Sequence, residues 1–243
     1  MSAEARCSGA PGVGPRRHAH PKVALLHHGR RPAAALIHRI YDVEIVGAEH
    51  VPATGPVIVA ANHISFIDGP LLSILGPRPV HSLTKVEMFH GPVGAFLHAT
   101  GQIPVSRHLT DLAAVRISLE VLRAGGVLGV YPEATRGPGD LSRFRRGAAY
   151  FAMVTGAPVV PLIYLGTRPA GTPISAIPRP GTRMAMTFGP AVQVPARPWP
   201  RRSADVAELT DRIRNAMLET LRSAQDATGL SLPGPAPDGE VEE

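Results

Sequence analysis

The chain has 243 residues, of which 44% are hydrophobic, so it can bury the core of one large α/β domain. Its net charge of +6 comes almost entirely from arginine, which suits phosphate-bearing partners, although a solvated basic surface explains the charge equally well. The single cysteine, Cys7, excludes a disulfide within the chain and a thiolate metal site, and 5% aromatic residues without a helix-turn-helix or zinc-finger pattern argue against nucleic acid as a partner.

The two ends of the chain differ in composition from its middle. Residues 1–20 are rich in Gly, Pro and Arg, and we expect a disordered leader, which lacks the apolar segment of a signal peptide. Residues 229–243 form a Pro/Gly/acidic tail, for which we also expect disorder. No apolar run is long enough to span a bilayer. We therefore expect a single domain over residues 21–228, in a reducing intracellular setting, that contacts lipid only at its surface.

Between these ends, apolar runs alternate with segments of helical spacing. The predicted strands cover residues 43–47, 57–61, 80–85, 102–106, 127–131, 158–165 and 183–189. The predicted helices cover residues 66–75, 92–100, 111–124, 146–156 and 203–227, and several end at a glycine such as Gly125 or Gly156. Apolar strands that alternate with helices predict an α/β fold with a mainly parallel or mixed central sheet, covered by helices on both faces.

Polar residues gather where the predicted strands end, which is where ligands bind in such sheets. His63 and Asp68 follow the strand at 57–61. A histidine can remove a proton from a hydroxyl near neutral pH, and a carboxylate on its other ring nitrogen fixes the tautomer. An asparagine at position 68 would then hold the ring in the wrong tautomer. The same two residues also fit a plain loop histidine and an aspartate that stabilises a helix N-terminus, so the residue types alone leave both interpretations open.

Two other kinds of chemistry fit this loop poorly. Ser65 lies between Ile64 and Phe66, whereas a nucleophilic serine needs small neighbours in a tight turn. One histidine and one aspartate are too few to bind a metal, and the sequence contains no HExxH or Cys/His set. We therefore expect neither a serine hydrolase nor a metal centre.

Charged residues also follow the strands at 80–85 and 127–131. Lys85 ends the first strand and Glu87 follows it, and Glu133 and Arg136 follow the second. The basic stretch 144–147 then begins the next helix, where guanidinium groups and N-terminal amides together can bind an anion. A solvated loop in which Glu133 pairs with an arginine is the alternative interpretation.

Taken together, these stretches resemble the glycerophospholipid acyltransferase family, which includes the 1-acylglycerol-3-phosphate acyltransferases. "NHISFID" at 62–68 matches the family's NHxxxxD motif, and "GQIPVSR" at 101–107 matches GxIxxxR. "YPEATR…FRRG" at 131–147 matches a PEGTR stretch with a basic F-[KR]-x-G, and "VVPLIY" at 159–164 supplies the apolar V-P motif. The four motifs occur in the family's order over about residues 43–194.

The resemblance implies an enzyme of glycerolipid acyltransferase-like fold that acylates a lysophospholipid, with His63 as general base and Asp68 orienting it. The donor would be acyl-CoA or acyl-carrier protein, with no cofactor and no metal. The acceptor would be a lysophospholipid, most simply 1-acylglycerol 3-phosphate, at a membrane surface. The resemblance also assigns binding roles: substrate to Asn62, Lys85, Arg107, Glu133, Thr135 and Arg136, and the acyl pocket to Val160 and Pro161.

Some features leave the acceptor open. Ala134 stands where the family has glycine, which would reshape the loop if that position needs φ > 0, and Gly137 replaces a frequent serine. The same chemistry on a polyol, a glycolipid or another lysophospholipid is one alternative, and an inactive membrane-surface binding protein is another. Residues 21–41 have the composition of an interfacial or a packed first helix. We expect a cytoplasmic protein, peripheral on the inner face of the cell membrane.

Overall fold

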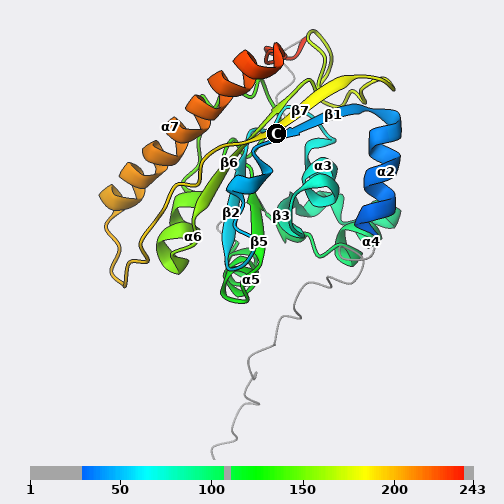
Figure 1. Cartoon of the computed structure of the whole chain (residues 1–243). Helices are drawn as coiled ribbons and strands as arrows, with labels where there is room; N and C mark the ends of the chain where they lie inside the picture. Colours follow the sequence, from blue (N-terminus) through cyan, green and yellow to red (C-terminus); the bar gives the residue numbers. More distant parts are fainter. Residues whose placement is uncertain (1–28, 107–110, 238–243) are drawn as a thin grey trace, which may run out of the picture.

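A seven-stranded sheet with helices on both faces forms the fold, as a computed structural model of the chain shows (Figure 1). The structure describes residues 29–106 and 111–237. The helices are α2 (Arg30–Ile40), α3 (Asp68–Leu75), α4 (Gly91–Ala99), α5 (Leu112–Arg123), α6 (Gly147–Thr155) and α7 (Ser203–Thr228). The strands are β1 (Asp42–Val46), β2 (Val57–Ala61), β3 (Val80–Lys85), β4 (Ile103–Val105), β5 (Val127–Val130), β6 (Val159–Leu165) and β7 (Arg183–Phe188). Two short 3-10 turns, η1 (Ala48–His50) and η2 (Val86–Met88), follow β1 and β3.

The sheet is mixed, with the strand order β1-β7-β6-β2-β5-β3-β4. The five strands from β6 to β4 run parallel, whereas β7 pairs antiparallel with β6, and β1 runs parallel with β7. The carboxyl ends of β2, β3 and β5 therefore meet at one edge of the sheet. This edge is where the sequence clusters its polar motif residues, and the predicted α/β class with a parallel or mixed sheet is confirmed.

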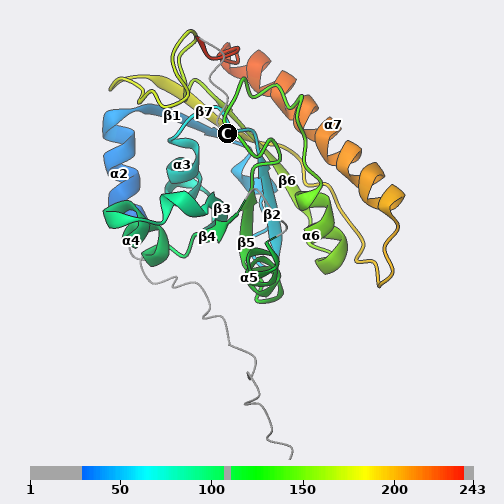
Figure 2. The same ribbon diagram turned by 180° about the vertical axis from the view of Figure 1, so that it is seen from behind.

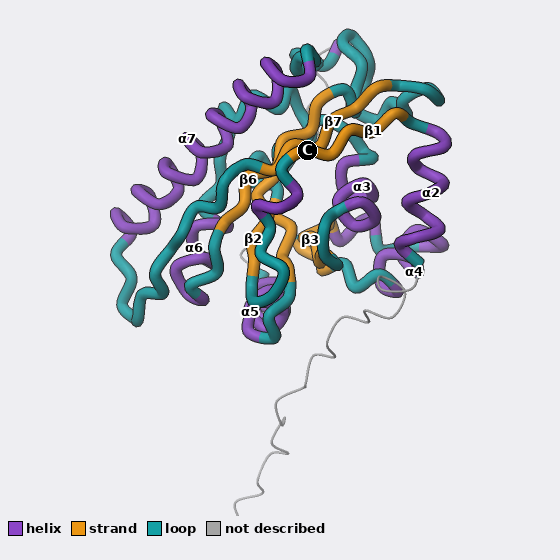
Figure 3. Tube along the Cα trace, viewed as in Figure 1, coloured by secondary structure: helices purple, strands orange, loops and turns teal. Residues whose placement is uncertain are grey.

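The alternation of side chains along the central strands builds one core on each face. Along β2, Ile58 and Ala60 pack into a core with α5, α6 and α7, while Val57, Val59 and Ala61 pack into a core with α2 and α3. Figure 2 shows α5, α6 and α7 on one side of the sheet and α2 and α3 on the other. In the trace of Figure 3, the strands form a continuous layer between them. Because both faces are covered, the strands read as continuous apolar runs.

The segment at 229–237 corrects one expectation from the sequence. We expected disorder from residue 229 onward, yet Leu230 and Leu232 pack against the core with α7. The carbonyl of Gly234 also accepts a hydrogen bond from Arg168. The last described residues therefore belong to the folded unit.

The remaining expectations about the chain ends are only partly covered by the structure. Of the segment at 21–41, residues 30–40 form α2, whose Ala34 and Ile37 pack against the core with α3. The predicted leader at 1–20, with Cys7, lies outside the described residues. Among the residues that are described, no helix has both the length and the apolar character needed to cross a membrane.

Candidate active site

His63 and Asp68 form a hydrogen-bonded pair at the carboxyl end of β2. The chain leaves β2 at Ala61, and Asp68 is the first residue of α3, so the loop between them folds back on itself. The Nδ1 atom of His63 lies 3.0 Å from Oδ2 of Asp68. The Asp68 side chain is buried, whereas 21% of the His63 side chain is exposed. One end of the pair is therefore fixed inside the protein, and the other can meet a ligand.

Four donors converge on the Asp68 carboxylate. Besides His63, the backbone N–H groups of Ile64 and Ser65 donate to Oδ2 at 2.8 Å each, and the Thr167 hydroxyl donates to Oδ1 at 2.7 Å. A buried carboxylate would be costly without such donors. Because Asp68 is an acceptor, Nδ1 of His63 carries the proton, and Nε2 is left to act as an acceptor.

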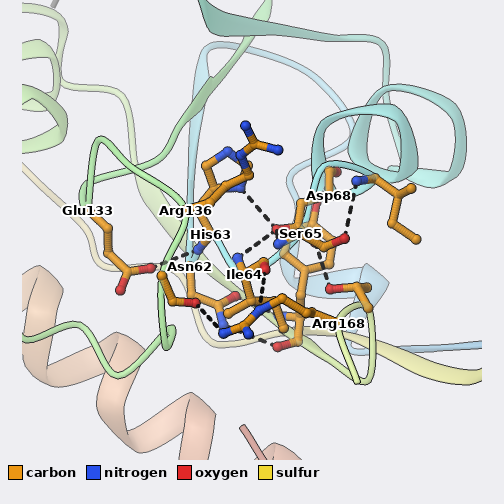
Figure 4. Close-up of polar contacts among 12 residues, drawn as sticks. Asn62, His63, Ile64, Ser65, Asp68, Glu133, Arg136 and Arg168 are labelled. Atoms are coloured by element: carbon orange, nitrogen blue, oxygen red, sulfur yellow. Dashed lines mark hydrogen bonds and ion pairs between the residues drawn. The ribbon is translucent and has the colours of Figure 1, made fainter. Parts of the chain in front are cut away.

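The His63 ring is also held by its neighbours. The Tyr131 ring packs against it with 4.4 Å between ring centroids. The carbonyl of His63 accepts from the N–H of Gly137, and the N–H of His63 donates to the Glu133 carboxylate at 2.8 Å. Figure 4 shows the bond between His63 and Glu133 together with the other polar contacts of the loop. The ring therefore has a fixed position before any ligand binds.

A large cavity of about 1380 Å³ opens in front of His63. Its wall is largely apolar and includes side chains from α3, β3, α4 and α5, such as Ile74, Leu83, Phe96 and Val115. Basic side chains also line it: Arg30, Lys85, Arg136, Arg145 and Arg146. An apolar cavity with cations and one histidine suits a ligand that has an acyl chain and an anionic group.

Three of the predicted substrate-binding residues line this cavity. They are Lys85 at the end of β3, and Thr135 and Arg136 in the loop after β5. The Arg136 guanidinium carbon lies 5.9 Å from the centroid of the Phe66 ring, which also lines the cavity. The expected role of Arg107 falls on a residue outside the described part of the chain.

Asn62 and the residues at 160–161 turn inward, which corrects their predicted roles. The Asn62 amide donates to the carbonyl of Tyr164 and accepts from its N–H, so it extends the pairing of β2 with β6. Val160 and Pro161 lie buried inside β6 and do not line the cavity. The acyl wall comes instead from α3, α4, β3 and α5, because the middle of β6 is covered on both faces.

Glu133 is a second correction, since its carboxylate also points away from the cavity. It accepts from the N–H groups of His63 and Leu141 and is only 6% exposed. Burial raises the pKa of Glu133 to about 7, and the two backbone hydrogen bonds oppose that rise. The residue therefore joins the histidine loop to the segment at Leu141, whereas Arg136 lines the cavity.

Two residues just after β6, which no motif in the sequence singled out, also hold the loop. Thr167 donates to Asp68, and Arg168 donates from Nε to the carbonyl of Ile64 at 2.9 Å. Both are buried. The rule that applied to the other strands, that polar residues at carboxyl ends build the site, would have selected them.

Among the described residues, no group of three or more His, Cys, Asp or Glu side chains could hold a metal ion.

The sequence and the fold both match known acyltransferases. The family model described as Acyltransferase matches residues 42–165, which include His63, Asp68 and Arg136. The 1-acyl-sn-glycerol-3-phosphate acyltransferase of Bacillus subtilis is 29% identical over 126 residues, which are 51% of this chain and 63% of that protein. The chloroplastic 1-acyl-sn-glycerol-3-phosphate acyltransferase BAT2 of Brassica napus is 28% identical over 216 residues, which cover 83% of this chain and 60% of that protein. The chain thus covers less than two thirds of the length of either relative.

A solved structure has the same fold. The 1-acyl-sn-glycerophosphate (LPA) acyltransferase PlsC of Thermotoga maritima superimposes with a TM-score of 0.59 at 24% sequence identity. The match covers 80% of this chain and 77% of that one.

Proposed function

The chain belongs to the Acyltransferase family, and on that premise we propose that it transfers an acyl group from an acyl thioester to the free hydroxyl of 1-acylglycerol 3-phosphate, giving phosphatidate. The observation that carries the proposal is the His63–Asp68 pair, in which Nδ1 is bound to the carboxylate and the ring lines the cavity. The names of the relatives in Bacillus and Brassica support the same acceptor. The donor is acyl-CoA or acyl-carrier protein, each of which presents the same thioester.

The reaction needs one general base and no acyl-enzyme. Nε2 of His63 takes the proton of the acceptor hydroxyl as its oxygen attacks the thioester carbonyl, and Asp68 stabilises the imidazolium that forms. The tetrahedral intermediate then expels the thiolate, which takes up the proton from His63. Ser65 fits a loop-building role, since its side chain is buried and its Oγ accepts from the N–H of Ile67.

The acceptor's phosphate would bind to the cations at the cavity wall. Arg136 and Lys85 supply the charge, and Thr135, which precedes Arg136 in the sequence, lines the same cavity. A guanidinium offers a phosphate two parallel donors, so Arg136 is the principal candidate. The apolar wall between α3, α4 and α5 would hold an acyl chain.

The exposed apolar side chains at the cavity mouth suit a lipid bilayer. Val93 and Phe96 on α4 are 48% and 47% exposed, Phe66 is 40% exposed, and all three also line the cavity. The helix carries no charged Lys, Arg, Asp or Glu side chain. Its apolar face is therefore continuous with the cavity that holds His63, and cations line the same cavity, as a surface that contacts an anionic bilayer requires. We propose that this face meets the membrane, with the protein peripheral on the inner leaflet.

Activity and vesicle binding test these proposals separately. Purified protein is assayed with several acyl-CoAs against lysophosphatidate, other lysophospholipids and glycerol 3-phosphate. We expect lysophosphatidate to be the best acceptor, and His63→Ala to lower turnover by about two to four orders of magnitude. A better unphosphorylated acceptor, or a folded His63→Ala variant with near-normal turnover, would disprove the assignment.

The membrane face is tested by cosedimentation with anionic vesicles. Phe96→Asp should weaken binding, whereas Ile177→Asp, at a 72% exposed apolar residue that does not line the cavity, should not. Equal loss in both variants would contradict the assignment of the face.

A further inference from the structure

Arg168 is an almost fully buried arginine whose hydrogen bonds go to backbone carbonyls. It is 1% exposed, and its side chain donates to the carbonyls of Ile64, Gly137, Thr172 and Gly234 at 2.6–3.1 Å. It does not line the cavity. A buried guanidinium has a large desolvation cost, so its five donors need partners of this kind.

One of these bonds connects Arg168 to the catalytic pair through a single peptide group. Nε of Arg168 donates to the carbonyl of Ile64, and the N–H of the same peptide, which belongs to Ser65, donates to Oδ2 of Asp68. The peptide group therefore lies between the guanidinium and the carboxylate, as the close-up in Figure 4 shows. The cation polarises this peptide in the direction that strengthens its N–H bond to the carboxylate.

The other bonds hold the surrounding loops to the same point. Arg168 donates to the carbonyl of Gly137, and the N–H of Gly137 donates to the carbonyl of His63. The bond to Gly234 adds the segment that follows α7. One side chain thus joins the histidine loop, the loop that carries Arg136, and the last described residues.

We propose that Arg168 is a positioning residue for acyl transfer: it fixes the Ile64–Ser65 peptide and so holds Asp68, and through it His63, in the reactive arrangement. This inference rests on the proposed function, and it concerns the rate of the chemical step and not the binding of substrate. A second observation agrees with it. Burial lowers the pKa of Arg168, and the charge of Asp68 opposes that change, so the two groups interact electrostatically although they share no direct bond.

A merely structural arginine would give a different kinetic result. If Arg168 only stabilises the fold, a folded variant should turn over normally. If it positions the pair, turnover should fall while the KM values for donor and acceptor stay unchanged, because Arg168 does not line the cavity. A mutation away from the reacting atoms that displaces a catalytic group by up to about 1 Å lowers turnover by about ten- to a hundredfold.

Two variants and one control make the test. Arg168→Met removes the charge and the donors, and Arg168→Lys keeps a charge but offers no planar fork to four carbonyls. Arg183→Met is the control, since Arg183 pairs with Glu44 at the exposed start of β7. Each is assayed for kcat and both KM values at a temperature where circular dichroism shows it folded.

We expect kcat to fall about ten- to a hundredfold in Arg168→Met, by less in Arg168→Lys, and not at all in Arg183→Met, with KM values within about twofold. If Arg168→Met does not fold, Arg168→Lys decides, since the inference requires it to lose turnover at unchanged KM. Normal kcat in a folded Arg168 variant, or a loss confined to KM, would overturn the inference. Failure of the proposed function would appear separately, as inactivity of the wild-type protein towards lysophosphatidate; the same comparison then uses the best acceptor found.

Discussion

Asp68→Asn should remove the charge of the His63–Asp68 pair while keeping the orientation of His63. Oδ2 of Asp68 accepts three N–H donors, from His63, Ile64 and Ser65, whereas among the described residues Oδ1 accepts only the Thr167 hydroxyl. An asparagine must therefore place its carbonyl oxygen at the Oδ2 position and its NH₂ towards Thr167, whose hydroxyl can also accept. The wrong tautomer that the sequence alone would predict for asparagine is thus excluded by the two backbone donors.

The expected loss is that of one charge. A hydrogen bond to a charged group contributes about 1.5–3 kcal/mol and one to a neutral group about 0.5–1.5 kcal/mol, so the imidazolium loses roughly 1–2 kcal/mol of stabilisation. At about 1.4 kcal/mol per tenfold change, turnover should fall about five- to thirtyfold. A wrong tautomer would cost far more, about 10⁴-fold in the serine protease case. The acceptor KM should stay unchanged, because Asp68 is buried.

The assay compares kcat and KM of wild type, Asp68→Asn, His63→Ala and the double variant. Because Asp68 acts through His63, the double variant should be no slower than His63→Ala alone. Asp205→Asn serves as the control, since Asp205, which lies on α7, pairs with Arg197 and does not line the cavity. A loss of about 10⁴-fold, effects that add in the double variant, or a rise in KM alone would each refute the reasoning.

Three other outcomes follow from residues around the pair. Arg136→Ala should raise the KM for a phosphorylated acceptor about ten- to a hundredfold and leave the KM for a short acyl-pantetheine thioester unchanged. Arg136→Lys should recover only part of the acceptor binding. Equal weakening of both substrates would show that Arg136 is structural. Glu133 has a pKa of about 7 in the folded protein against an ordinary value of 4.5, so the free energy of unfolding should fall by up to about 3 kcal/mol as pH rises through this window. In urea unfolding from pH 4.5 to 8, Glu133→Gln should lack this pH dependence. The same slope in wild type and variant would contradict the prediction. Ala134 has φ of 61°, so Ala134→Gly should raise the free energy of unfolding by about 1 kcal/mol. Ala113→Gly, on the exposed face of α5, should lower it by a similar amount. If Ala134→Gly does not stabilise the protein, the argument that Ala134 is strained fails.

The fold could be predicted closely because each element has local signals. The strands at 57–61 and 80–85 have the predicted bounds, and α5 begins where Asp111 accepts from the N–H groups of Ala113 and Ala114. The antiparallel direction of β7 had no such signal, since a strand buried on both faces has the same pattern in either direction. It depends on the connection at 166–182, which has no regular element among its residues.

The tail at 229–237 was misjudged for a different reason. Its Pro/Gly-rich composition is typical of disorder, yet two leucines and one carbonyl suffice to fix it against the core and Arg168. Composition averages over a segment and gives no weight to single contacts. The same limit hid the contribution of Gly234 to the site.

Within the site, the sequence pointed to several of the polar residues but not to their directions, and it missed Thr167 and Arg168. His63 and Asp68 could be paired from their spacing and from the family resemblance, and their bond is present. Asn62 and Glu133 were assigned to substrate by the family resemblance, and both also follow buried strands. However, a polar residue at a strand end can equally bind the backbone of a neighbouring loop, and nothing in its type or spacing distinguishes the two cases.

The polar residues around the site therefore divide into an outer and an inner set. The outer set, with His63, Lys85 and Arg136, lines the cavity, and the inner set, with Asn62, Asp68, Glu133 and Arg168, binds backbone groups. Loops that carry catalytic groups lack the regular hydrogen bonds of helices and strands, so they need an inner set to stay fixed. Because the outer cations line the cavity in which we propose that substrate binds, their loss should raise KM. Loss of an inner residue should lower kcat, since it moves His63 without changing what the cavity can bind.

The left-handed backbone of Ala134 fits this division. Its N–H donates to the carbonyl of Tyr131, and the bonds of Gly137 to His63 and Arg168 hold the rest of its loop in place, so the strain persists where the chain must turn from β5 back to His63.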